Sequence, residues 1–117
     1  MSRPRIPQGV TRAVRAYDIV DDEGDPLLVD GWTVKGVACR DYPEGEVLTE
    51  WSTAPTAGQG QATAIGREVR LLITPALSSA WNCDRVAIQA EMTSPDGTRT
   101  ERIIDQIFDV DREAVRT

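Results

Sequence analysis

Histidine is absent from this chain, and its absence removes the general base that serine and cysteine nucleophiles normally use. The sequence also lacks the GxSxG, phosphate-loop and HExxH patterns of common catalytic sites. Only carboxylates remain, and no spacing among the 19 Asp and Glu residues singles out the pair that glycoside hydrolysis needs. We therefore expect a protein that is not an enzyme.

Residues that bind metals or cofactors are equally scarce. The two cysteines, Cys39 and Cys83, form no CxxC pattern and have no histidine to complete a zinc site. We expect two reduced core residues, with a disulfide as the alternative if the chain matures outside a reducing compartment. The acidic run 21–25 lacks the spacing of a calcium-binding loop, which favours a solvated turn over a calcium site. No cofactor is expected.

The chain also contains no long hydrophobic run. No stretch approaches the roughly 18 apolar residues of a membrane span, and the first ten residues lack the apolar core of a secretory signal. At 117 residues, with 40% hydrophobic and 27% charged residues, the composition is typical of one packed domain. We expect synthesis in the cytoplasm and no contact with a membrane.

Charge is distributed unevenly along the chain. Residues 1–16 carry four arginines and no acid, whereas the rest holds nine basic and 19 acidic side chains, a net charge of −10. The acidic body disfavours binding of nucleic acid. We predict that residues 1–16 form an extended basic arm, stiffened by two prolines, and that the body occupies 17–117. The arm arginines predicted to bind a partner are Arg3, Arg5, Arg12 and Arg15.

We further expect residues 2–12 of this arm to be disordered in the isolated protein and to become ordered on the acidic surface of a neighbouring subunit. The alternative is a terminal tail that has no partner.

Alternating hydrophobicity predicts an all-β body. Strands are expected at 32–40, 47–53, 62–65, 68–74, 85–92 and 99–110, and residues 11–20 form either a strand or a short helix. Turn signals occur at 21–26, 42–45 and 94–98, and a short helical insert is expected at 75–81. This pattern predicts a single antiparallel β-sandwich, immunoglobulin-like or jelly-roll-like.

The same alternation predicts which side chains form the core. From the last hairpin these are Ile88, Met92, Ile104 and Phe108. The three tryptophans are expected to pack in the core as well, in preference to forming an exposed platform for sugars. They are Trp32, Trp51 and Trp81.

Two segments taken in order, GDPLLVDGWTVKGVA at 24–38 and VRLLITPALSSAW at 69–81, resemble small tail proteins of tailed phages. They also resemble the N-terminal sandwich of baseplate upper proteins. In that pattern an acidic-glycine turn leads to an aromatic-Thr-Val strand, a later strand ends in a Thr-Pro helical turn, and a hairpin like the one at 94–98 closes the domain. The resemblance covers roughly residues 18–110.

The resemblance implies a structural virion component with no catalytic residues, such as a phage minor tail or baseplate protein. Its expected partners are other tail, baseplate or head-tail subunits, in a homo- or hetero-oligomer within the particle. Its expected location is the virion, after synthesis in the host cytoplasm. A carbohydrate-binding module and a capsid decoration protein are the alternatives.

Overall fold

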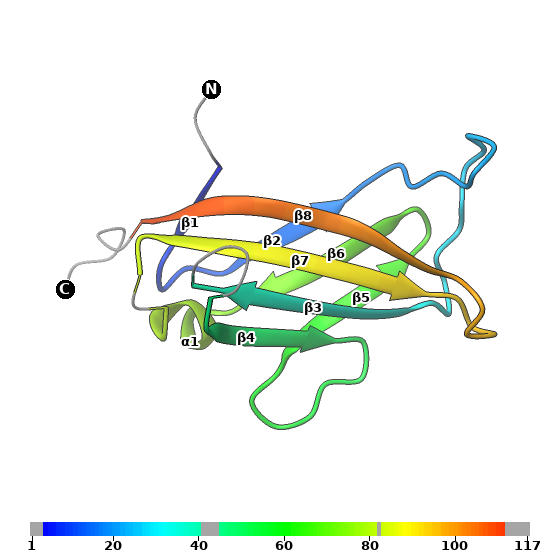
Figure 1. Ribbon diagram of the computed structural model, residues 1–117. Coiled ribbons are helices and arrows are strands. Elements are labelled where there is room, and N and C mark those ends of the chain that lie inside the picture. The colour runs from blue at the N-terminus through cyan, green and yellow to red at the C-terminus, as the bar shows by residue number, and fades with distance from the viewer. Residues whose placement is uncertain (1–3, 41–44, 82, 112–117) are drawn as a thin grey trace.

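The computed structural model describes residues 4–40, 45–81 and 83–111 (Figure 1). Eight strands and one short helix follow in the order β1 (Arg5–Pro7), β2 (Arg12–Ala16), β3 (Thr33–Cys39), β4 (Val47–Ser52), β5 (Gly60–Ile65), β6 (Glu68–Ile73), α1 (Pro75–Ser79), β7 (Arg85–Thr93) and β8 (Thr100–Asp111). Within these ranges no helix has the length and hydrophobicity needed to cross a membrane. Strands make up nearly all of the regular secondary structure in these ranges.

The strands form one sheet in the order β1-β8-β7-β3-β4-β5-β6-β2, and this sheet curls until it is nearly closed into a barrel (Figure 1). The expected two-sheet sandwich is not confirmed. Strand β5 begins beside the end of β4, where Trp51 pairs with Gly60, and this junction makes one sheet of what would otherwise be two. The junction and the β1–β8 pair are parallel, so the sheet is mixed and not purely antiparallel.

The last hairpin, β7 and β8, confirms the prediction made from its turn residues. The amide of Ser94 donates to the carbonyl of Arg99 at 2.8 Å, and Gly97 has the positive φ of 78° that favours glycine. The four predicted core residues are all buried, with Ile88 and Met92 fully inaccessible to solvent. Most of the turn expected at 42–45 lies outside the described ranges, because residues 41–44 are not described.

Helix α1 confirms the helical insert and is shorter than the expected 75–81. The hydroxyl oxygen of Thr74 accepts a hydrogen bond from the amide of Leu77 at 3.2 Å, which caps the first turn, and Pro75 occupies the first helical position. Trp81 follows the helix and is completely buried.

The N-terminal segment does not stand apart from the body. Strand β1 pairs with β8, β2 pairs with β6, and Ile6 is only 3% exposed. Between these strands, the side-chain amide of Gln8 donates to the carbonyl of Ser78 at 3.1 Å. The expectation of a disordered arm is therefore wrong for residues 4–12, because burial of Ile6 and backbone pairing hold this segment in the sheet.

Two of the three tryptophans form the centre of the core. The rings of Trp51 and Trp81 are packed edge to face with centroids 6.4 Å apart, and both are at most 1% exposed. Trp32 is partly buried against the same cluster. Cys39 carries a free thiol, so the alternative of a disulfide with Cys83 is not realised.

Candidate partner-binding pocket

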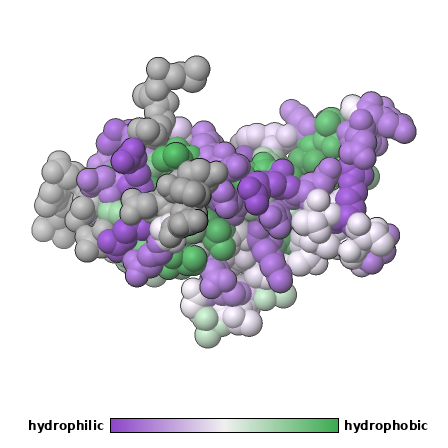
Figure 2. Space-filling model, viewed as in Figure 1, coloured by the Kyte–Doolittle hydropathy of each residue, from purple (hydrophilic) through white to green (hydrophobic). Residues whose placement is uncertain are grey.

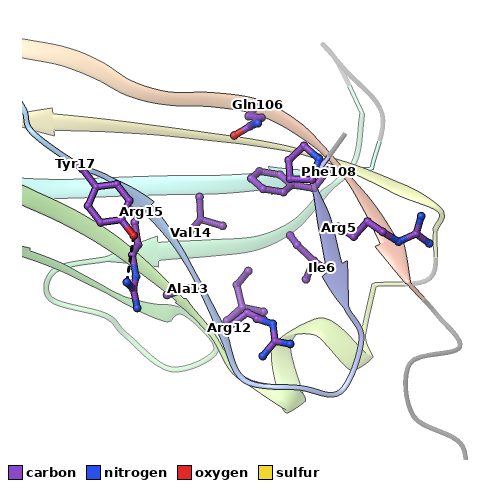
Figure 3. Close-up of a pocket in the computed structure, with 11 residues that line it drawn as sticks. Arg5, Ile6, Arg12, Ala13, Val14, Arg15, Tyr17, Gln106 and Phe108 are labelled. Atoms are coloured by element: carbon purple, nitrogen blue, oxygen red, sulfur yellow. Dashed lines mark hydrogen bonds between the residues drawn. The ribbon is translucent and has the colours of Figure 1, made fainter. Parts of the chain in front are cut away.

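A pocket of about 360 Å³ lies at the seam where the curled sheet does not close. Strands β1 and β2, which are the two edges of the sheet, contribute most of its lining together with the residues that flank them, and one position of β6 and two of β8 complete it (Figure 3). An edge strand has backbone groups and side chains that no neighbouring strand covers. The seam thus brings the two edges of the sheet together at one place.

The middle of the pocket is apolar. Ile6 comes from β1, Val14 from β2 and Phe108 from β8, and each is less than 10% exposed. Alternation along each strand turns these side chains inward, so the pocket opens onto the hydrophobic core.

Three arginines surround this apolar centre. Arg5, Arg12 and Arg15 all line the pocket, their side chains are exposed, and Figure 3 shows them placed around Ile6 and Val14. None of the described residues that line the pocket is Asp or Glu. The seam is therefore a locally positive surface on a protein whose net charge is −6.

These guanidinium groups differ from most others in the part of the chain that the structure describes. Arg40, Arg67, Arg70, Arg99 and Arg102 each form an ion pair with a carboxylate. None of the three pocket arginines forms an ion pair with a described residue. Their charges are available to a ligand, and guanidinium groups bind carboxylates in a bidentate geometry.

Tyr17 stabilises the charged form of Arg15. The guanidinium of Arg15 donates a hydrogen bond to the Tyr17 hydroxyl at 3.2 Å, and this contact raises the pKa of Arg15 above its ordinary value. Tyr17 itself is 60% exposed at the end of the pocket. The pair presents a cation and an aromatic ring side by side.

Three of the four arginines predicted to bind a partner are thus brought together, and Arg3 lies outside the described residues. The sheet unites them, since Arg5 and Arg12 lie on strands at its opposite edges. Sequence reasoning missed Tyr17 and Phe108. Tyr17 could have been found from its position two residues after Arg15, which places both on one side of an extended chain. Nothing in the sequence links Phe108 to this site.

The acidic run 21–25 forms a tight turn. The Asp21 carboxylate accepts hydrogen bonds from the amides of Glu23 at 2.9 Å and Asp25 at 3.0 Å, so it satisfies the turn's own backbone. In the described ranges no three Asp, Glu or Cys side chains are grouped so that they could hold a metal ion.

Known proteins were compared with this chain by family model, by curated sequence and by solved structure. None of these comparisons gave a match. The function is therefore argued from the pocket and from the sequence itself.

Proposed function

We propose that this chain is a non-enzymatic structural virion protein, a phage minor tail or baseplate component, that assembles through protein–protein contacts. The seam pocket is its docking site, and an acidic segment of a neighbouring subunit is the ligand. The observation that carries the proposal is the set of three arginines around an apolar centre, none of which forms an ion pair with a described carboxylate. Arginine and aromatic side chains are among the residues that contribute most to the binding energy of protein interfaces.

The virion assignment draws its support from the resemblance of segments 24–38 and 69–81 to phage tail proteins. Under the same resemblance, the curled sheet is read as a sandwich in which β1, β8, β7, β3 and β4 form one layer and β5, β6 and β2 the other. Each layer would then present its outer face to a different neighbour.

The charge distribution favours a protein partner over nucleic acid. Outside the first 16 residues the chain has a net charge of −10, which repels phosphates. Nucleic acid is a long polyanion that would extend past the small positive pocket. Its phosphates would then be repelled by the net negative charge of the rest of the chain. A short acidic peptide segment would meet only the pocket.

A carbohydrate-binding module has less support than it had from the sequence. Sugar platforms need exposed aromatic faces, and the rings of Trp51 and Trp81 are buried in the core. A capsid decoration protein uses the same kind of contact as a tail protein, and the two differ only in where the subunit lies in the particle.

The test is the occupancy of this chain in purified particles, measured by quantitative mass spectrometry, with a low-resolution map to locate it. Arg12→Glu should lower the occupancy several-fold, and more strongly at low salt than at high salt, because salt screens the contact. Lys35→Glu is the matched control. It makes the same change of charge at an exposed position of β3, outside the pocket, and should leave occupancy unchanged.

Equal occupancy of the Arg12→Glu and Lys35→Glu variants would contradict the role of the pocket. Absence of the wild-type chain from particles would contradict the virion assignment.

A further inference from the structure

The seam pocket leaves open which acidic segment docks there, and the same molecule carries one in the loop that follows Tyr17. We infer that the occupant is a second copy of this chain, whose loop 18–25, called here the acidic loop, enters the pocket. This inference rests on the proposed role of the pocket as a docking site. It adds the identity of the partner and the geometry of the assembly.

The acidic loop is negatively charged, whereas the pocket is lined by three arginines. It contains five carboxylates and no basic residue. Asp18 and Asp22 already form ion pairs, with Arg67 and Arg99 respectively. Glu23 and Asp25 are exposed and form no ion pair with a described residue, so these two carboxylates are the ones we assign to the arginines of the next copy.

The loop is also held in a fixed shape. The amide of Asp21 donates to the carbonyl of Asp25 at 2.9 Å, and Val20 and Pro26 form a β-bridge at the base of the loop. Together with the bonds to the Asp21 carboxylate, these contacts fix the backbone before any partner arrives. A preformed loop loses little conformational entropy on docking.

Exposed apolar side chains accompany the acidic loop. Val20, Leu28 and Ile65 are 46%, 64% and 69% exposed. Their segments are joined by backbone hydrogen bonds, since the amide of Val29 donates to the carbonyl of Gly66 at 2.7 Å. Figure 2 shows apolar surface beside the hydrophilic loop at this end of the molecule. An acidic loop with apolar neighbours matches a positive pocket with an apolar centre in both charge and hydrophobicity.

The acidic loop begins directly after the pocket residue Tyr17. Figure 1 shows it projecting at the end of the molecule away from β1. We therefore assign the contact to two copies, each of which uses a different surface. Such a head-to-tail interface repeats from copy to copy and produces a ring or an open chain, which is the form of assembly expected in a tail or baseplate.

Two variants test this directly by sedimentation velocity at low salt. Arg12→Ala with Arg15→Ala disables the pocket, and Glu23→Ala with Asp25→Ala disables the loop. All four residues are exposed, and circular dichroism verifies that both variants fold. Wild-type protein should form species larger than the 12.8 kDa monomer, and these should dissociate as salt is raised. Lys35→Ala, which touches neither surface, should assemble like the wild type.

Each disabled variant alone should remain monomeric. An equimolar mixture should form a heterodimer and nothing larger, because only one intact pocket and one intact loop can meet. Wild type that stays monomeric at every concentration would overturn the inference, as would a mixture that remains monomeric. If either result occurs while Arg12→Glu still lowers occupancy in particles, the pocket binds a different subunit, and the proposed function stands without this inference.

Discussion

The indole ring of Trp51 lies against the α-carbon of Gly60, its partner at the β4–β5 junction. A Cβ atom on residue 60 would be 2.5 Å from Cδ1 of Trp51 and 2.9 Å from a methyl carbon of Leu77. The ring cannot move away easily, because its Nε1 donates a hydrogen bond to the carbonyl of Leu72 at 2.6 Å. Any larger residue at this junction would therefore force the surrounding core side chains to shift.

Gly60→Ala should destabilise the protein by about 1 to 3 kcal/mol, the usual cost of an added methyl group in a packed core. Gly36→Ala is the control, because its Cβ would lie 3.1 Å from a methyl group of Leu71, a longer contact than those at residue 60, and should cost less. Urea unfolding measures both. An equal or smaller loss for Gly60→Ala would show that the Trp51 ring can shift.

Thr49→Val should cost about 1 to 3 kcal/mol, because it leaves a buried donor without an acceptor. The indole nitrogen of Trp81 donates to the Thr49 hydroxyl at 2.7 Å, and both residues are at least 95% buried. Thr49→Ser keeps the hydroxyl and should be the more stable of the two variants. Urea midpoints in the reverse order would mean that the hydrogen bond contributes less than the methyl group.

Phe108→Ala should cost about 3 to 5 kcal/mol, because the ring is 7% exposed and forms part of the core as well as the pocket. Val47→Ala, at a position that is 52% exposed, serves as the control and should change stability by less than about 0.5 kcal/mol. A loss under about 1 kcal/mol for Phe108→Ala would contradict its placement in the core.

The turn of the last hairpin should make stability depend on pH in the acid range. The Ser94 hydroxyl donates to the Asp96 carboxylate at 2.6 Å, and the amide and hydroxyl of Thr98 also donate to it, which lowers the pKa of Asp96 from 3.8 to about 2. Because the folded pKa is the lower one, this contribution is complete above pH 3.8 and is lost as pH falls through about 2.

Carboxyl NMR titration measures this pKa. Ser94→Ala should move it back toward 3.8 and weaken the pH dependence of stability between these values, whereas the exposed-site control Ser79→Ala should leave both unchanged. A Ser94→Ala titration that matches the wild type would show that this hydrogen bond does not govern the titration.

The elements that the sequence alone determined are those with local causes. Pro95, Asp96 and Gly97 between two alternating runs specify the last hairpin, because turn geometry and side-chain alternation act over a few neighbouring residues. Thr74 and Pro75 specify the start of α1 in the same way. Burial of Ile88 and Ile104 follows from the period of two along a strand, and no knowledge of the neighbouring strands is needed.

Only the tertiary structure decided how the sheet closes and where the pocket lies. In the β1–β8 strand register Arg5 lies opposite Asp109, more than 100 residues away in the chain. Strand β2 reaches the seam from the opposite edge of the sheet. The sequence pattern of four arginines and two prolines suggested a separate arm, yet the segment joined the sheet. The reason is that strand pairing depends on backbone hydrogen bonds, which every residue except proline can donate, and on which apolar side chains find space in the core. Neither property is encoded in a local pattern of residues.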